Sequence, residues 1–156
     1  MKSKRVERLD MLDWRIIEEL QLDGRVPLST LGRRVGLSQP AVSERVKRLE
    51  SAGVIDGYAA RINFHAIGLD LLAIARVKTT FEKMPACLKA FASMPEILEV
   101  HRVTGEDCFI LKVIVPRASQ LESVVDRLAK YGSVTTSIVL SSRRPMPVTH
   151  RTTAAR

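Results

Sequence analysis

The sequence predicts an α+β protein with an N-terminal winged helix-turn-helix domain and a C-terminal ferredoxin-like βαββαβ domain. Residues 27–53 contain two short amphipathic helical patterns on either side of a glycine corner, which is typical of a helix-turn-helix. Residues 71–140 alternate strand and helix signals in the order β-α-β-β-α-β. We therefore expect domains at residues 1–62 and 70–156, joined by a linker at 63–69.

A first helix is predicted between Asp10, a good N-cap residue, and the Asp23-Gly24 pair that ends it. Its apolar positions recur at helical spacing and comprise Leu12, Ile16, Ile17 and Leu20. Trp14 falls beside this stripe, so we expect it to be partly exposed and available for a subunit contact. The helix gives the two following helices a surface on which to pack.

The helix-turn-helix itself is predicted from a sharp corner. Gly36 supplies the left-handed conformation that ends one helix, and Ser38 is a good N-cap for the next. Pro40 lies in the first turn, where a missing N–H costs little. The apolar stripes comprise Leu28, Leu31 and Val35 before the corner, and Val42, Val46 and Leu49 after it. The second helix is expected to span about residues 39–52.

The polar face of this second helix suits double-stranded DNA. A helix in the major groove needs short side chains near its N-terminus to reach base edges, and cations to meet phosphates. The candidate base-reading and positioning residues are Ser38, Gln39, Pro40, Ser43 and Glu44. The candidate phosphate-binding residues are Arg33, Arg34, Arg45, Lys47 and Arg48. A solvated face on an ordinary helical hairpin is the alternative, but the corner and the excess of cations favour DNA.

The formal net charge of +8 is unevenly distributed along the chain. Residues 1–65 carry +3, residues 66–140 carry +1, and the tail from residue 141 carries +4. This asymmetry favours a polyanionic partner, and nucleic acid over a membrane, because no basic amphipathic helix has an aromatic face. No apolar run is long enough to span a bilayer, and Cys87 and Cys108 lack metal-ligand spacing. We expect a reducing cytoplasm, with no disulfide, metal or cofactor.

Residues 54–64 are β-branched and short, which predicts an extended strand or wing. In the second domain, strands are expected at 71–80, 97–104, 108–115 and 134–140. Helices are expected at 85–94, with Leu88, Phe91 and Met94 on its apolar side, and after Ser119, which can act as its cap. The sequence Gly105-Glu106-Asp107 predicts a hairpin turn between the second and third strands.

The third strand is apolar on both sides, since Ile110 and Ile114 alternate with Phe109, Leu111, Val113 and Val115. One face of a ferredoxin-like sheet carries no helix, and an apolar strand should not be half solvated. We therefore expect that face to be buried in a homodimer, with Leu111 and Val113 at the interface. Such a dimer would also pair two DNA-reading heads.

The order of these parts and several local strings resemble the leucine-responsive and asparagine-responsive (Lrp/AsnC, feast/famine) regulator family over nearly the full chain. The matching strings are Leu9-Asp-x-Leu-Asp13-x-x-Ile16, Asp23-Gly-Arg25, Arg34-Val-Gly-Leu-Ser38, Arg45-Val-Lys-Arg-Leu-Glu50, Gly53-Val-Ile-x-Gly57-Tyr58 and Val103-Thr-Gly-Glu-Asp107. The resemblance implies a DNA-binding transcription factor that dimerises, often assembles further into octamers, and responds to an amino acid bound by the C-terminal domain.

The resemblance also implies an effector pocket at a contact between dimers. The matching positions here are Gly105, Glu106, Asp107, Thr135, Thr136 and Ser137. A carboxylate of the hairpin could pair with the ligand ammonium, and backbone N–H groups or hydroxyls could receive its carboxylate. In many relatives an aromatic residue occupies the position of Asp107 and an acid that of Cys108, so this chain departs from the family there.

Two other functions share the same two-domain plan. Relatives of this plan decarboxylate a tetrapyrrole (sirohaem) in haem synthesis, and His65, His101 and His150 would be the candidate residues. No nucleophile and base pair, metal cluster or phosphate loop is present in the sequence, so we expect no catalytic site. An effector-independent DNA-bending protein is the third possibility. The sequence leaves open which amino acid is sensed, which genes are controlled, the sign of regulation, and whether assembly stops at two subunits.

Overall fold

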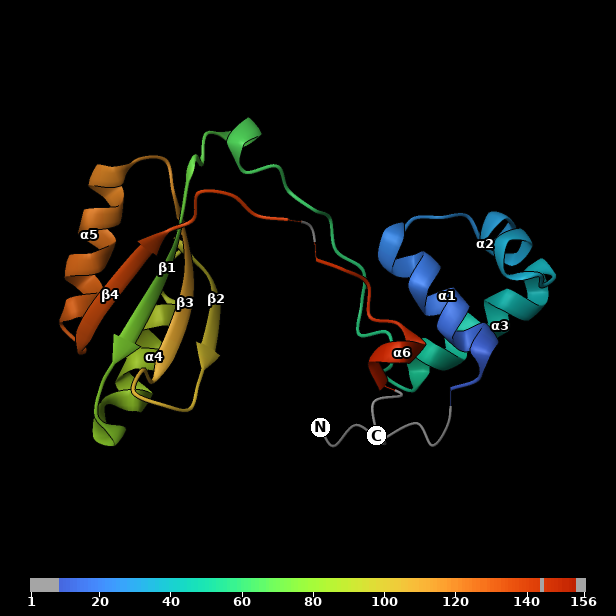
Figure 1. Ribbon diagram of the computed structural model, residues 1–156, viewed down its shortest axis with the longest axis horizontal. Coiled ribbons are helices and arrows are strands. Elements are labelled where there is room, and N and C mark those ends of the chain that lie inside the picture. The colour runs from blue at the N-terminus through green and yellow to red at the C-terminus, as the bar shows by residue number, and fades with distance from the viewer. Residues whose placement is uncertain (1–8, 144, 154–156) are drawn as a thin grey trace. The chain divides into compact units, whose positions relative to one another are not determined.

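The computed structural model describes residues 9–143 and 145–153, and the chain divides into two compact units. A helical unit contains residues 1–61 together with 144–156, and a sheet unit contains residues 62–143. The division falls beside the expected linker. The tail, which we expected with the C-terminal domain, crosses the division at residue 143, and its later part contacts α1 (Met11–Leu22; Figure 1).

Helix α1 begins with a reciprocal cap. The Asp10 carboxylate accepts the Asp13 N–H at 2.8 Å, and the Asp13 carboxylate accepts the Asp10 N–H at 3.1 Å. This capping box satisfies two N–H groups that the helix cannot bond internally. The expectation for Trp14 was wrong: only 9% of it is exposed, and its ring packs against the His150 ring in a T-shaped arrangement with the two ring centroids 6.0 Å apart.

Helix α2 (Leu28–Val35) ends at Gly36, whose φ of 76° is left-handed, as the sequence predicted. Helix α3 (Gln39–Ser51) begins at Ser38, whose hydroxyl accepts the Ala41 N–H at 3.4 Å. The corner is tighter than the apolar pattern alone indicates. A Cβ at Gly32 would lie 2.7 Å from the Leu37 carbonyl oxygen, so a side chain at Gly32 would push the turn away from α2.

The three helices enclose a small core. Five of its side chains are almost fully buried, namely Ile16, Leu31, Val35, Val42 and Leu49. They include members of all three predicted stripes, which confirms the helical periods. The buried side of α3 fixes which of its residues face outward.

Residues 54–64 do not form a strand, so that part of the prediction was wrong. The segment runs irregularly after α3, because the helical unit offers no described strand with which its backbone could pair. Tyr58 fastens it by donating a hydrogen bond to Glu50 at 2.9 Å. Burial, together with this bond and the Glu50 charge, raises the pKa of the Tyr58 hydroxyl to about 12.

The sheet unit has the predicted order of elements and confirms the α+β fold. Its antiparallel strands lie in the order β2-β3-β1-β4. Their bounds are β1 Leu71–Lys78, β2 Ile97–Arg102, β3 Phe109–Val115 and β4 Ser133–Ile138. The helices are α4 (Met84–Ala92) and α5 (Ala118–Ala129), with single 3-10 turns at His65–Ile67 and Phe81–Lys83, and a short α6 (His150–Thr153) ends the described tail.

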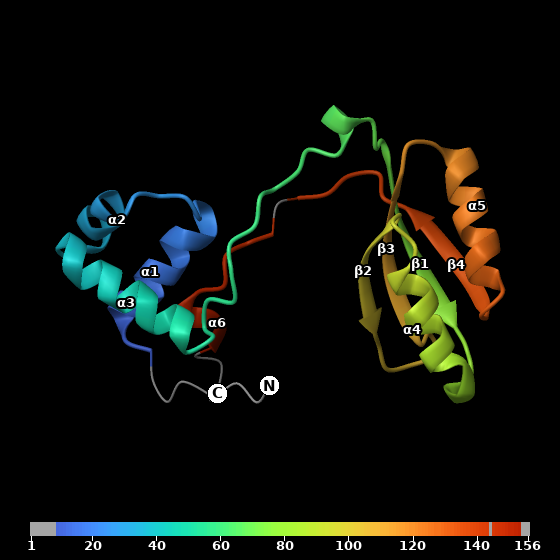
Figure 2. The ribbon, with the colours of Figure 1, turned by 180° about the vertical axis from the view of Figure 1, so that it is seen from behind.

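Helices α4 and α5 cover one face of the sheet (Figure 2). That inner face is apolar and comprises Ala73, Ala75, Val77, Phe109, Leu111, Val113 and Val115. Two local expectations need correction. Leu88 is exposed while Cys87 is buried in its place, and α5 begins at Ala118 after Arg117, so Ser119 is inside the helix and does not cap it.

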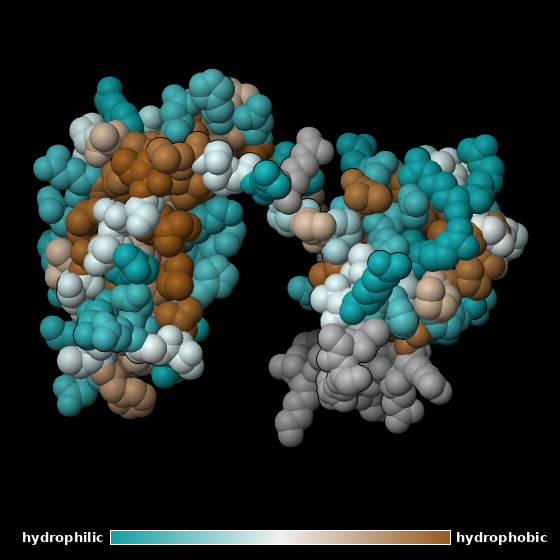
Figure 3. Space-filling view, viewed as in Figure 1, coloured by the Kyte–Doolittle hydropathy of each residue, from teal (hydrophilic) through white to brown (hydrophobic). Residues whose placement is uncertain are grey.

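Among the described residues, no helix packs on the opposite, outer face of the sheet. The pairing of strands places Leu72 beside Ile114, Ile74 beside Lys112, and Arg76 beside Ile110 on that face. Apolar atoms gather over the strands in the space-filling view (Figure 3). Leu111 and Val113, which we expected at a dimer interface, are instead fully buried beneath α4 and α5. The isoleucines Ile74, Ile110 and Ile114 lie on the outer face instead.

Candidate nucleic-acid interface and effector site

The outward side of α3 is polar and open. Gln39, Pro40, Glu44 and Lys47 are exposed, and Ser43 is half-buried. Because Val42, Val46 and Leu49 face the core, these side chains point away from α1 and α2. Short side chains therefore occupy the N-terminal half of the outward side, and a lysine lies one turn further along.

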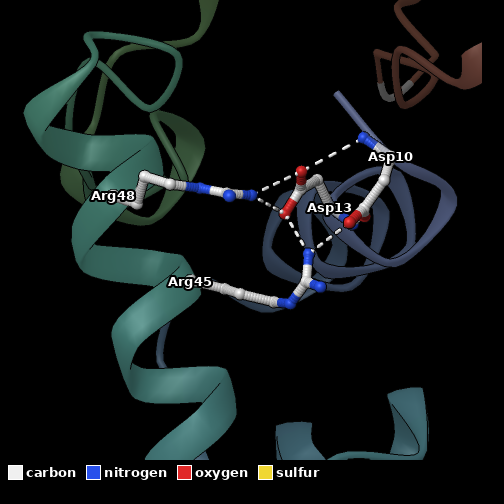
Figure 4. Close-up of polar contacts among 4 residues, drawn as sticks. All are labelled: Asp10, Asp13, Arg45 and Arg48. Carbon is white, nitrogen blue, oxygen red and sulfur yellow. Dashed lines mark hydrogen bonds and ion pairs between the residues drawn. The ribbon is translucent and has the colours of Figure 1, made fainter. Parts of the chain in front are cut away.

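The two arginines of α3 bind carboxylates within the helical unit (Figure 4). Arg45 donates to Asp10 at 2.6 Å and to Asp13 at 2.8 Å. Arg48 donates to both oxygens of Asp13, at 2.6 and 2.7 Å. Asp13 is only 1% exposed, so its carboxylate is a buried charge that both guanidinium groups neutralise.

This network assigns different roles to the two arginines. Arg45 is 26% exposed and bonded to two carboxylates, which makes it a structural link between α1 and α3. The hydrogen bond from Arg45 lowers the pKa of the Asp10 carboxyl, and the same contacts raise the pKa of the Arg45 guanidinium. Arg48 is 58% exposed, so part of its side chain still faces solvent.

The arginines of α2 are also engaged. Arg34 pairs with Glu19 of α1 at 2.8 Å, and Arg33 donates to the Thr30 hydroxyl at 3.3 Å. Arg15 completes this link by donating to the Arg34 carbonyl oxygen at 2.9 Å. Within residues 9–143 and 145–153, Lys47 is the α3 cation that has no carboxylate partner.

The hairpin between β2 and β3 carries the first group of predicted effector residues. Gly105 has a φ of 107°, a conformation that favours glycine, and Glu106 is exposed while Asp107 is half-buried. Neither carboxylate has a hydrogen-bond or ion-pair partner in the described part of the chain. The hairpin is anchored at Cys108, whose N–H donates to the Val77 carbonyl oxygen at 2.9 Å.

The second group lies on the edge strand β4, whose first residue is at the same end of the sheet as the hairpin. Thr135 pairs with Arg76 and Ser137 with Ile74, so both hydroxyls are on the outer face, whereas Thr136 pairs with Ala75 on the inner face. Strand β1 lies between β3 and β4, which separates these two strands by roughly 10 Å. Within one chain the hairpin and the β4 residues therefore lie on separate parts of the sheet, and Ser137 is opposite the middle of β1.

An open groove of about 830 Å³ in the helical unit was not expected from the sequence. It lies between α1 and the segment after α3, and Val148 of the tail contributes to its wall. Its apolar lining includes Trp14, Ile17, Leu20, Val54 and Ile55. Helical periodicity places Ile17 and Leu20 on the apolar stripe of α1. It gives no indication that the tail contacts this helix.

The three histidines considered for catalysis lie on three different elements. His65 pairs with Asp70 after the linker, His101 on β2 lies 3.3 Å from Glu99, and His150 lies against Trp14. No group of three or more metal-ligating residues occurs among the residues that the structure describes. No helix in the same residues is long and apolar enough to cross a membrane.

Comparison with known proteins assigns a family to both units. Residues 9–50 match the AsnC-type helix-turn-helix domain, and residues 72–148 match the Lrp/AsnC ligand binding domain. The chain is 42% identical over 137 residues to the leucine-responsive regulatory protein of Rhizobium meliloti, covering 85% of this chain and 86% of that protein.

Two solved structures resemble the whole fold. Bacillus subtilis LrpC aligns with a TM-score of 0.83 and 29% identity, covering 88% of this chain and 98% of LrpC. A transcriptional regulator from Neisseria meningitidis, solved as a complex with L-methionine, aligns with a TM-score of 0.83 and 28% identity, covering 89% and 94% of the two chains.

The buried carboxylate of Asp13 generates a stability prediction. Asp13→Ala removes the capping box and the hydrogen bonds to both arginines, which should lower the free energy of unfolding by about 2–4 kcal/mol after allowing for re-solvation of Arg48. Urea denaturation followed by circular dichroism measures the change. Glu18→Ala, on the same helix, is the control and should cost less than about 0.5 kcal/mol; equal effects of the two substitutions would contradict the role of Asp13.

The outward side of α3 generates a DNA-binding prediction. Lys47→Ala should weaken binding to all duplex sequences and reduce the slope of log K against log salt by roughly 0.9, because one phosphate is no longer neutralised. Gln39→Ala or Ser43→Ala should instead change which sequence is preferred, by about 1–3 kcal/mol for each base contact. Fluorescence anisotropy with labelled duplexes at several salt concentrations measures both effects, and an unaltered slope in Lys47→Ala would exclude this side of α3.

Proposed function

The chain belongs to the Lrp/AsnC family of transcriptional regulators, and on that premise we propose that it binds operator DNA as a homodimer whose activity an amino acid modulates. It is a DNA-binding transcriptional regulator. The observation that carries the proposal is the outward side of α3, where Gln39, Ser43 and Lys47 are available to a duplex. A regulator of the chromosome works in the compartment that contains it, so we place this one in the cytoplasm.

Homodimerisation follows from the outer face of the sheet. Its central strands β1 and β3 present Leu72, Ile74 and Ile110 where no helix covers them. An apolar patch of this kind is stable when a second copy covers it, and two copies related by a two-fold axis bury the same patch on each. The two α3 helices then read two half-sites, which increases affinity over that of one head.

The amino-acid effector is assigned to the hairpin end of the sheet. The ligand ammonium pairs with Glu106 or Asp107, neither of which has a described partner, and backbone N–H groups at Gly105 receive its carboxylate. Thr135 and Ser137 supply hydroxyls on the outer face. The L-methionine complex of the Neisseria regulator supports this class of ligand.

Because the hairpin and β4 lie on separate edges, one chain does not enclose a small ligand there. We therefore assign the pocket to a contact between dimers, in which the hairpin of one chain and β4 of another close around the amino acid. Binding then changes how dimers assemble into larger oligomers, up to an octamer. The hairpin and α3 belong to different units, so the ligand affects DNA binding through the spacing of the DNA-binding domains in the assembly.

The alternative functions have less support. A tetrapyrrole decarboxylase would need converging basic and histidine side chains, yet His65, His101 and His150 each pack with a separate neighbour. We propose no catalytic residue and no cofactor. Absence of a Soret band in protein purified from cells supplied with haem precursors would agree with that, and a stoichiometric Soret band would contradict it. An effector-independent DNA-bending protein would show the same DNA affinity with and without each amino acid.

The outer-face interface predicts an oligomeric change. Ile110→Asp places a charge in the centre of the apolar patch, and burying that charge costs several kcal/mol, so the variant should be monomeric at micromolar concentration. Light scattering coupled to gel filtration measures the mass. Leu88→Asp adds the same charge on exposed α4 and should remain dimeric; a dimeric Ile110→Asp variant would place the interface elsewhere.

The hairpin carboxylates predict loss of ligand binding. An amino acid at 100 times its Kd should raise the free energy of unfolding by roughly 2.7 kcal/mol, which a thermal-shift screen of the twenty amino acids detects. Glu106→Ala or Asp107→Ala should abolish this shift while leaving affinity for a single DNA site unchanged. Glu122→Ala on α5 is the matched control and should keep the full shift, and an undiminished shift in both hairpin variants would place the pocket elsewhere.

A further inference from the structure

The helical unit has no excess of positive charge in its described part before the tail. Residues 9–61 contain eight Lys or Arg and eight Asp or Glu. Arg34, Arg45 and Arg48 are moreover paired with carboxylates of α1. A protein that binds DNA gains most of its sequence-independent affinity by neutralising phosphates with cations. The three helices alone therefore contribute little sequence-independent affinity for DNA.

Nearly all of the net charge lies at the two ends of the sequence. Residues 1–8 contain four cations and one anion, and residues 141–156 contain four arginines and no acid. The rest of the chain carries only +1 of the total of +8. The positive charge is thus concentrated outside the three helices that match the DNA-binding domain.

The structure holds the tail against the helical unit. The Gln21 side chain donates to the Val148 carbonyl oxygen at 2.8 Å and accepts the Val148 N–H at 2.8 Å. This reciprocal pair uses both polar groups of one backbone residue, as a neighbouring strand would. Two turns of α1 earlier on the same side, Trp14 packs against His150 of α6, which lies beside the helices in Figure 1.

The described part of the tail lies close to the network that holds α3. His150 lines a small hollow together with Leu9, Asp10 and Met11. Asp10 is the residue that binds Arg45 of α3 at 2.6 Å. Arg151 follows His150 directly and is exposed, so the docked tail places it on the helical unit. Its guanidinium has no carboxylate partner among the described residues.

We propose that the described part of the C-terminal tail, residues 145–153, is a second DNA-contacting element, docked on α1 through Gln21 and Trp14, in which Arg151 binds the phosphate backbone of the duplex. This inference rests on the proposed DNA-binding function. Helix α3 reads bases, and the tail contributes sequence-independent affinity, because arginine is suited to phosphate and no acidic residue opposes it in the tail. Gln21 acts on DNA only through the tail, as a positioning residue.

The experiment compares full-length variants by anisotropy with labelled duplex DNA over a range of salt. Arg151→Ala should reduce the slope of log K against log salt by roughly 0.9, because one phosphate is no longer neutralised. Lys89→Ala, on α4, removes the same charge from the sheet unit and should leave the slope unchanged. Neither variant should change the preference for one DNA sequence over another.

Gln21→Ala separates docking from charge. Gln21 is exposed, so its replacement should not affect folding, and the net charge stays the same. The variant should lower DNA affinity several-fold and reduce the salt slope, since the released Arg151 no longer lies on the helical unit. An unchanged slope in Arg151→Ala, an equal decrease in Lys89→Ala, or full affinity in Gln21→Ala would overturn the proposal. Lys47→Ala measured alongside tests α3 separately, so failure of the tail is distinguishable from failure of the DNA-binding function.

Discussion

The buried carboxylate of Asp13 is the constraint on which the helical unit depends. It closes the first turn of α1 and binds both arginines of α3, so one side chain fixes the start of one helix and its position against another. A carboxylate that is 1% exposed is stable only while these partners remain, since leaving it unpaired would be costly. The orientation of α3, and with it the outward side that we propose as the DNA-binding surface, follows from this arrangement.

The same constraint has an electrostatic consequence. Cations that hold the helices together cannot contribute fully to DNA binding, and Arg45 is the clearest example because it contacts two carboxylates. The recognition helix is then left with short polar side chains and Lys47, which suit discrimination between bases better than general attraction to phosphate. General attraction is better supplied from elsewhere in the chain, where arginines have no acidic neighbours.

Local signals accounted for most of the fold. Gly36, Ser38 and the repeat of Val42, Val46 and Leu49 specify the helix-turn-helix because each acts within a few residues of itself. Contacts across long separations were not predictable. Asp13 lies 32 and 35 residues from its arginines, and Gln21 lies 127 residues from Val148, while a helical period carries no information about such partners. For this reason the sequence offered Arg45 as a phosphate ligand and gave no indication that the tail contacts α1.

In the sheet, the sequence did not show which residues of β3 face the helices. Every position of β3 except Lys112 is apolar, so alternation could not tell Ile110 from Leu111, and only the pairing with β1 shows which faces the helices. The candidate effector residues were found through family motifs, and the register adds that Thr136 faces away from Thr135 and Ser137. A pocket built from several chains leaves no signature in the fold of one chain. Family motifs in the sequence identify candidate residues, but neither the sequence nor the fold of one chain shows whether these residues come together.

The central claim is that α3 reads the major groove as one of a pair of heads, and methylation interference tests it most directly. A duplex enriched by the protein from a random pool would be methylated with dimethyl sulfate and sorted into bound and free fractions. Methyl groups at guanine N7, which lie in the major groove, should block binding at two clusters about one helical turn, or roughly 34 Å, apart. Interference confined to adenine N3 in the minor groove would contradict the claim.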